Sequence, residues 1–102
     1  MPSLEGIDLA RWQEDKNGCN GVRTSMRGAM DKEKTKLLSL GQMQIVELLG
    51  RPDKNELLKR NQKFFYYFIQ PSEECTGEKN VRSARLVIRF NAVGLAKEVS
   101  VE

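Results

Sequence analysis

The sequence predicts an α+β fold of two layers, in which an N-terminal helix hairpin packs on an antiparallel sheet of three to four strands. Before Pro52, apolar residues recur at the spacing of helices, and beyond it they alternate as they do in strands. Helices followed by strands are typical of α+β proteins with a mainly antiparallel sheet. The length of 102 residues suits one domain with one core.

The N-terminal segment, residues 1–24, is expected to form an arm tethered to the core, and residues 25–102 to form a single α+β domain. Turn-forming Asn-Gly pairs mark residues 17–21 of the arm. Asp8 stands where it can cap one short helical turn. Trp12 is the only tryptophan, and it is more typical of an anchor that holds the arm on the core than of a ligand site.

A first longer helix is predicted from about Ser25 to Leu38. Its apolar side chains lie near one stripe of the helix, which would face the core. These residues are Met26, Met30, Leu37 and Leu38.

A second, shorter helix has both ends marked in the sequence. Gly41 suits the N-cap, and Gln44 can reach back to its N–H. Gly50 suits a left-handed residue after the helix, and Pro52 prevents continuation. The two helices are joined by a short turn, so we expect them to pack as a hairpin.

Four segments after Pro52 are predicted to be strands. The strongest signal is Gln62 to Gln70, which is dense in aromatic residues. Ala84 to Phe90 alternates cleanly, and Leu95 to Val101 follows a turn. Glu56 to Lys59 is a weakly patterned first strand, and residues 72–80 are expected to form a polar loop.

The alternation of the strands predicts which side chains meet the helices. We expect a shared core formed by Ile45, Leu48, Leu49, Leu86, Ile88 and Phe90. The opposite face of that strand then carries Arg85, Val87 and Arg89.

The aromatic strand places one triplet of side chains on each face of the sheet. One triplet is Phe64, Tyr66 and Phe68, and the other is Phe65, Tyr67 and Ile69. The alternation does not distinguish which triplet packs on the helices. The apolar side chains of the remaining triplet must be shielded from solvent, either by the N-terminal arm with Trp12 or by a binding partner. A candidate partner surface therefore consists of Phe64, Tyr66, Phe68, Arg85, Val87 and Arg89.

The two cysteines, Cys19 and Cys75, are far apart in the sequence and both have polar neighbours. Their spacing excludes a CxxC redox motif. The alternatives are two free thiols or one disulfide, and the polar surroundings favour the disulfide because buried free cysteines usually have apolar neighbours. A disulfide would indicate an oxidising compartment, whereas free thiols would indicate the cytoplasm.

The composition argues against catalysis. There is no histidine, so the commonest general base and metal ligand are missing. Acidic pairs occur at residues 14–15, 31–33 and 73–74, in polar segments where nothing would raise a carboxyl pKa. We therefore predict a protein that is not an enzyme and that has no cofactor, no metal site and no small-molecule substrate.

A nucleic-acid-binding module is the alternative function. The net charge is +3, and basic residues lie beside the aromatic strand. Those cations are Lys59, Arg60, Lys63, Arg85 and Arg89. However, a charge of +3 attracts nucleic acid only weakly, and the RNP1 pattern is absent.

Short motifs along the chain resemble those of the SmpA/OmlA (BamE-like) family of small bacterial envelope lipoproteins. They are Leu40-Gly41, Ile45, Leu48-Leu49-Gly50, Pro52-Asp53, Tyr66-Tyr67, and the spacing of Leu86, Ile88, Phe90 and Gly94. The resemblance covers residues 25–102 and leaves residues 1–24 outside it. It departs from the family where Gly-Met-Thr commonly opens the second helix, because Leu40-Gly41 takes the Met-Thr places.

The resemblance implies a BamE-like or β-lactamase-inhibitor-protein-like fold, and a periplasmic, outer-membrane-anchored lipoprotein that binds other envelope proteins. Some members belong to the machinery that assembles outer-membrane β-barrels, and the fold class includes secreted inhibitors of β-lactamases. Cys19 follows Lys16-Asn17-Gly18, which lacks the apolar residues of a lipobox. A lipid anchor would therefore lie upstream of this chain, and it would be the only membrane contact.

Overall fold

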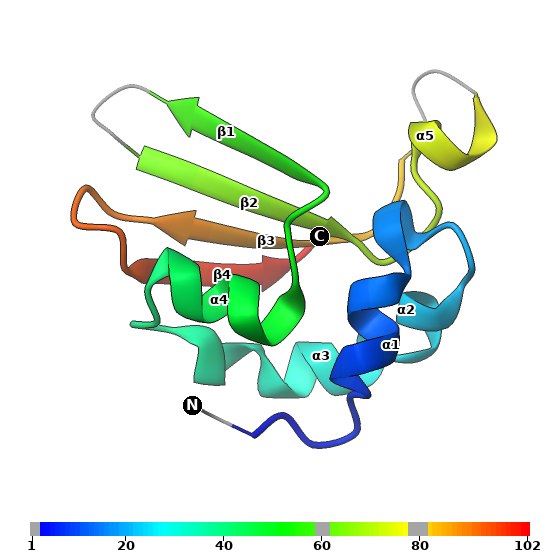
Figure 1. Cartoon of the computed structure of the whole chain (residues 1–102), viewed down its shortest axis with the longest axis horizontal. Helices are drawn as coiled ribbons and strands as arrows, with labels where there is room; N and C mark the ends of the chain where they lie inside the picture. The colour runs from blue at the N-terminus through cyan, green and yellow to red at the C-terminus, as the bar shows by residue number, and fades with distance from the viewer. Residues whose placement is uncertain (1–2, 59–61, 78–81) are drawn as a thin grey trace.

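Helices occupy the first half of the chain, and the second half consists of strands with one short helix, α5, between β2 and β3 (Figure 1). The computed structural model describes residues 3–58, 62–77 and 82–102. Its four strands form one antiparallel sheet in the order β1-β2-β3-β4. The strands are β1 Lys54–Leu58, β2 Gln62–Phe68, β3 Arg85–Phe90 and β4 Ala96–Val101. The predicted α+β class is confirmed.

The N-terminal arm contains more helix than the sequence analysis expected. Asp8 caps α1 (Leu9–Glu14) by accepting a hydrogen bond from the backbone N–H of Arg11. A 3₁₀ turn, η1 (Lys16–Gly18), and α2 (Val22–Ser25) follow. The side chain of Trp12 is fully buried in the core, so its predicted role as an anchor is confirmed.

The single helix predicted from Ser25 to Leu38 is wrong, because the structure divides this segment. α2 ends at Ser25, and the next residue, Met26, interrupts the helical backbone with a φ of −100° and a ψ of 4°. α3 (Arg27–Glu33) begins there, and a tighter 3₁₀ turn, η2 (Lys34–Leu37), follows it. Leu38 is extended and 40% exposed rather than part of the buried stripe, because the chain turns toward the sheet at this residue.

Helix α4 (Gln42–Leu49) begins and ends where predicted, but the glycine that follows it has a different conformation. The side-chain amide oxygen of Gln44 accepts a hydrogen bond from the N–H of Gly41 at 2.9 Å. Gly50 has a positive φ of 81°, but its ψ of −175° is extended rather than left-handed helical. This combination is essentially restricted to glycine, and it sends the chain directly away from α4 toward β1. α4 packs more extensively on α1 than on α3.

The strands begin or end within two residues of their predicted bounds. β2 ends at Phe68 because Ile69 and Gln70 both donate to the backbone oxygen of Ala84 as the chain turns away. β1 begins at Lys54, earlier than predicted, and Lys59 lies outside the described residues. The polar loop predicted at 72–80 contains a short helix, α5 (Glu73–Thr76), whose Ser72 side chain accepts from the N–H of Glu74.

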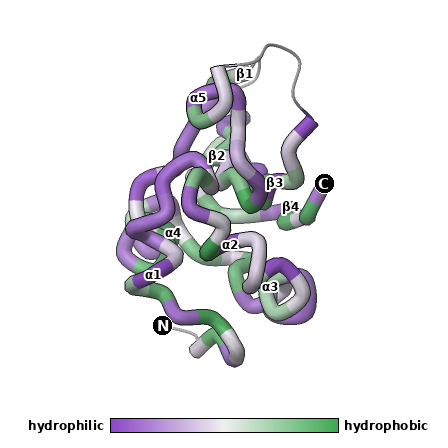
Figure 2. Tube along the Cα trace, turned by 90° about the vertical axis from the view of Figure 1, so that its right-hand side faces the viewer, coloured by the Kyte–Doolittle hydropathy of each residue, from purple (hydrophilic) through white to green (hydrophobic). Residues whose placement is uncertain are grey.

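Helices α1–α4 lie together on one side of the sheet, and α5 stands apart from them (Figures 1 and 2). The core between these layers contains Phe65, Tyr67 and Ile69, so this triplet is the inward one. Their predicted partners are buried with them: Ile45, Leu48, Leu49, Leu86, Ile88 and Phe90. The ring of Phe65 meets that of Phe90 edge-on at 4.7 Å.

The two faces of β3 are expected to differ in their contribution to stability. Ile88→Ala removes a fully buried side chain and should lower the free energy of unfolding by about 2–5 kcal/mol. Arg89→Ala removes an exposed ion pair with Glu98 and should cost about 1 kcal/mol or less. Denaturant unfolding of both variants checks this, and a larger loss for Arg89→Ala would contradict the assignment of the faces.

Candidate functional site

The outer face of the sheet collects the six residues of the candidate partner surface. Antiparallel partners share a face, so the strand register defines rows of side chains across it. One row is Lys54, Tyr66, Val87 and Ser100, the next is Glu56, Phe64, Arg89 and Glu98, and the third is Phe68, Arg85 and Glu102. We call these residues the outer face.

Two of the three aromatic side chains of the outer face are covered by cations from neighbouring strands. The guanidinium of Arg85 lies 4.3 Å from the centre of the Tyr66 ring, and the ammonium of Lys54 lies 5.8 Å from that of Phe68. Tyr66 and Phe68 are therefore only 7% and 8% exposed. The sequence analysis left the N-terminal arm or a partner as the group that covers this triplet, and in the structure long cationic side chains cover Tyr66 and Phe68.

The ion pairs of the outer face are weak and accessible. Arg89 contacts the carboxylate of Glu98 at 2.9 Å, and Arg85 approaches that of Glu102 only to 3.7 Å. Glu98 and Glu102 are largely exposed, so solvent screens both pairs. Burial, assisted by the nearby carboxylate of Glu56, raises the pKa of the Tyr66 hydroxyl. Arg85 and Arg89 can therefore exchange their present carboxylate partners for those of a bound protein at little cost in free energy.

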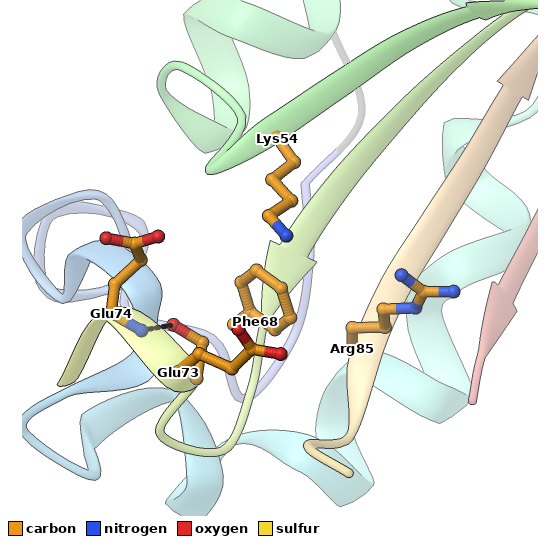
Figure 3. Close-up of a pocket in the computed structure, with 6 residues that line it drawn as sticks. Lys54, Phe68, Glu73, Glu74 and Arg85 are labelled. Atoms are coloured by element: carbon orange, nitrogen blue, oxygen red, sulfur yellow. Dashed lines mark hydrogen bonds between the residues drawn. The ribbon is translucent and has the colours of Figure 1, made fainter. Parts of the chain in front are cut away.

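A small cavity opens where the outer face meets α5. Its volume is about 140 Å³, large enough for one benzene-sized group. Figure 3 shows the amine of Lys54 pointing toward the ring of Phe68, with Arg85 rising from β3 beside it. Glu73 and Glu74 line the cavity from α5. The cavity therefore combines an aromatic surface with charges of both signs.

Cys19 and Cys75 form a disulfide with their Cα atoms 5.3 Å apart, as predicted. The bond joins the N-terminal arm to α5, beside a backbone hydrogen bond from Ser72 to Asn17. Gly18 has a positive φ of 68°, and a Cβ there would meet the backbone oxygen of Gln70 at 2.7 Å. Only glycine allows this close approach. A disulfide is more consistent with an oxidising compartment than with the cytoplasm.

A buried ionic network that the sequence analysis did not identify connects the arm to the sheet. The guanidinium of Arg23 contacts the carboxylate of Asp53 at 2.6 Å, with both side chains at most 3% exposed. Arg23 also donates to the backbone oxygens of Trp12 and Phe68. Asp15, also buried, accepts hydrogen bonds from the backbone of Asn20 and Arg23. No local pattern marks these residues, because their partners lie far along the chain.

A second surface feature missed from the sequence is an apolar patch at the end of the molecule where α4 begins. Gly41 forms a β-bridge with Leu95, which brings the start of α4 against the turn between β3 and β4. Four exposed apolar side chains lie along these two segments: Leu38, Met43, Val93 and Leu95. We call them the apolar patch.

Comparisons with protein-family models, curated proteins and solved structures find no match to this chain. Among residues 3–58, 62–77 and 82–102, no group of three or more histidine, cysteine or acidic side chains is placed to hold a metal ion. The described helices are all too short or too polar to cross a membrane.

Proposed function

We propose that this chain is a non-enzymatic, protein-binding or scaffold domain of a bacterial envelope lipoprotein, related to the SmpA/OmlA (BamE-like) family. In this proposal it supports outer-membrane protein assembly or envelope integrity, and a lipid anchor upstream of the chain holds it at the outer membrane. The disulfide supports an envelope location. The order of helices and strands is compatible with the family's fold.

The observation that carries the proposal is the composition of the outer face. It joins aromatic side chains to arginines that have only weak ion pairs, and arginine and aromatic residues are enriched in protein interfaces. Within the described face the cations Lys54, Arg85 and Arg89 are matched in number by carboxylates. Those carboxylates are Glu56, Glu98 and Glu102. A surface that tracks phosphates would carry an excess of cations, so the balance favours a protein partner.

The cavity beside α5 supports recognition of a partner side chain. It exposes part of Phe68 between cations on the strands and carboxylates on α5. A side chain entering it would bury the aromatic surface, while charged groups on the partner would pair with Arg85 or Glu73. The outer face and this cavity together form the proposed docking surface.

The test is capture of envelope proteins from a periplasmic extract by the wild-type domain and by two variants, Arg85→Ala and Arg89→Ala. We expect each variant to weaken binding about tenfold, because each removes an arginine from the docking surface. Arg11→Ala is the matched control, since Arg11 is exposed on α1, away from the sheet. Unchanged capture by both outer-face variants would contradict the proposed surface.

The nucleic-acid alternative is tested with generic single-stranded DNA across a range of salt concentrations. The protein-binding proposal predicts no measurable affinity at physiological salt. Micromolar binding that weakens steeply as salt is added would indicate phosphate contacts and would favour the nucleic-acid module instead.

A further inference from the structure

One edge of the sheet is covered and the other is open. At the β4 edge, the N–H of Ser39 donates to the backbone oxygen of Ala96, and the N–H of Ala96 donates to that of Leu40. At the other edge β1 pairs only with β2 among the described segments, and nothing described lies beyond it in Figure 1. An open edge strand presents backbone N–H and C=O groups that can pair with another strand.

The side chains of β1 are accessible. Residues 54–57 are all exposed, and Leu57 is 71% exposed. Lys54 and Glu56 point to the outer face, where neither forms an ion pair with a described residue. The edge therefore carries one charge of each sign, two residues apart, and neither belongs to an ion pair: Lys54 lies over the Phe68 ring and Glu56 lies beside the Tyr66 hydroxyl.

This charge pattern is self-complementary in one antiparallel register. When two copies of β1 pair about a two-fold axis at Asn55, Lys54 of each copy lies opposite Glu56 of the other. Two opposite-charge pairs then form across the new strand pair, which is a favourable arrangement. Moving the axis to Glu56 places two Glu56 side chains opposite each other, which is unfavourable. The charges thus select the pairing centred on Asn55.

We propose that the occupant of the β1 edge is a second copy of this chain, paired antiparallel about Asn55 to form a continuous eight-stranded sheet. The interface is isologous, so the same residues serve both copies. The two-fold axis is perpendicular to the sheet and leaves both outer faces on one side. The contact is confined to one short strand from each copy, so the dimer is weak and depends on protein concentration.

Sedimentation velocity over a wide range of concentrations, extending to the millimolar range, tests the proposal. The wild type is expected to shift from monomer to dimer as concentration rises. Glu56→Lys and Lys54→Glu each place like charges opposite each other, and each should weaken the dimer at least about tenfold. Glu47→Lys is the control, because it makes the same charge change on the exposed side of α4.

Two further measurements make the register itself testable. The double variant Lys54→Glu, Glu56→Lys exchanges the charges and should restore the dimer. A mixture of the two single variants should form a heterodimer, because every opposing pair in it then joins a carboxylate and an ammonium. A wild type that stays monomeric at all concentrations would overturn the proposal. So would a dimer that is indifferent to these substitutions, or a mixture of single variants that stays monomeric.

Discussion

Replacing both cysteines, by Cys19→Ser and Cys75→Ser, is expected to lower the free energy of unfolding by about 4 kcal/mol, from the chain-entropy model for a loop of this length. The disulfide closes a loop across a sequence separation of 56 residues. Without it the unfolded chain gains conformational freedom, while the folded arm keeps only its packing and hydrogen bonds. Denaturant unfolding with and without reductant measures the difference.

The matched control is the reduced wild type, which should unfold at the same denaturant concentration as the double serine variant. Titration of thiols in denatured protein that has never been reduced provides an independent check. Two reactive thiols in that material would contradict the disulfide.

Breaking the buried ion pair is expected to have the second large effect. Asp53→Ala leaves the guanidinium of Arg23 buried without a compensating charge, and should lower the free energy of unfolding by about 3–5 kcal/mol. The carboxylate of Asp53 also accepts hydrogen bonds from the backbone N–H groups of Asn17 and Phe68, and these are lost as well. Denaturant unfolding monitored by tryptophan fluorescence suits this variant, because Trp12 lies 5.0 Å from the same guanidinium.

Glu98→Ala is the control for this prediction, because it breaks an ion pair whose acidic partner is 71% exposed. Such a pair should contribute at most about 1 kcal/mol. The double variant Arg23→Met, Asp53→Asn should recover part of the loss from Asp53→Ala, because it removes the guanidinium that Asp53→Ala leaves buried without a compensating charge. An effect of Asp53→Ala no larger than that of Glu98→Ala would show that the buried pair does not hold the arm on the sheet.

The elements with local signals were predictable. Gly41 and Gln44 mark the start of α4, and Gly50 and Pro52 mark its end. The alternation of side chains along β3 places Ile88 and Arg89 on opposite faces of the sheet. The turn between β3 and β4 has the same local character, since the side chain of Asn91 accepts hydrogen bonds from Val93 and Leu95. In each case, interactions between residues close together in the sequence are sufficient to determine the local structure.

The candidate site was predictable only in part. Strand alternation groups Phe64 with Tyr66 and Phe68, and Arg85 with Val87 and Arg89, but only the register between β2 and β3 places the two groups on one face. Arg85 lies over the Tyr66 ring and leaves it only slightly exposed to solvent. This contact depends on how β2 and β3 pair. The choice of Phe65 and Tyr67 as the inward side chains depends on where the helices dock.

Local patterns of the sequence determine α4, the alternating faces of β3 and the turns, because their stabilising contacts join residues only a few positions apart. The tertiary structure alone determines the break at Met26, the pairing of Arg23 with Asp53 across 30 residues, and the open edge at β1. These features depend on groups that are distant along the chain and meet only after folding. The burial that strengthens such contacts exists only in the assembled core.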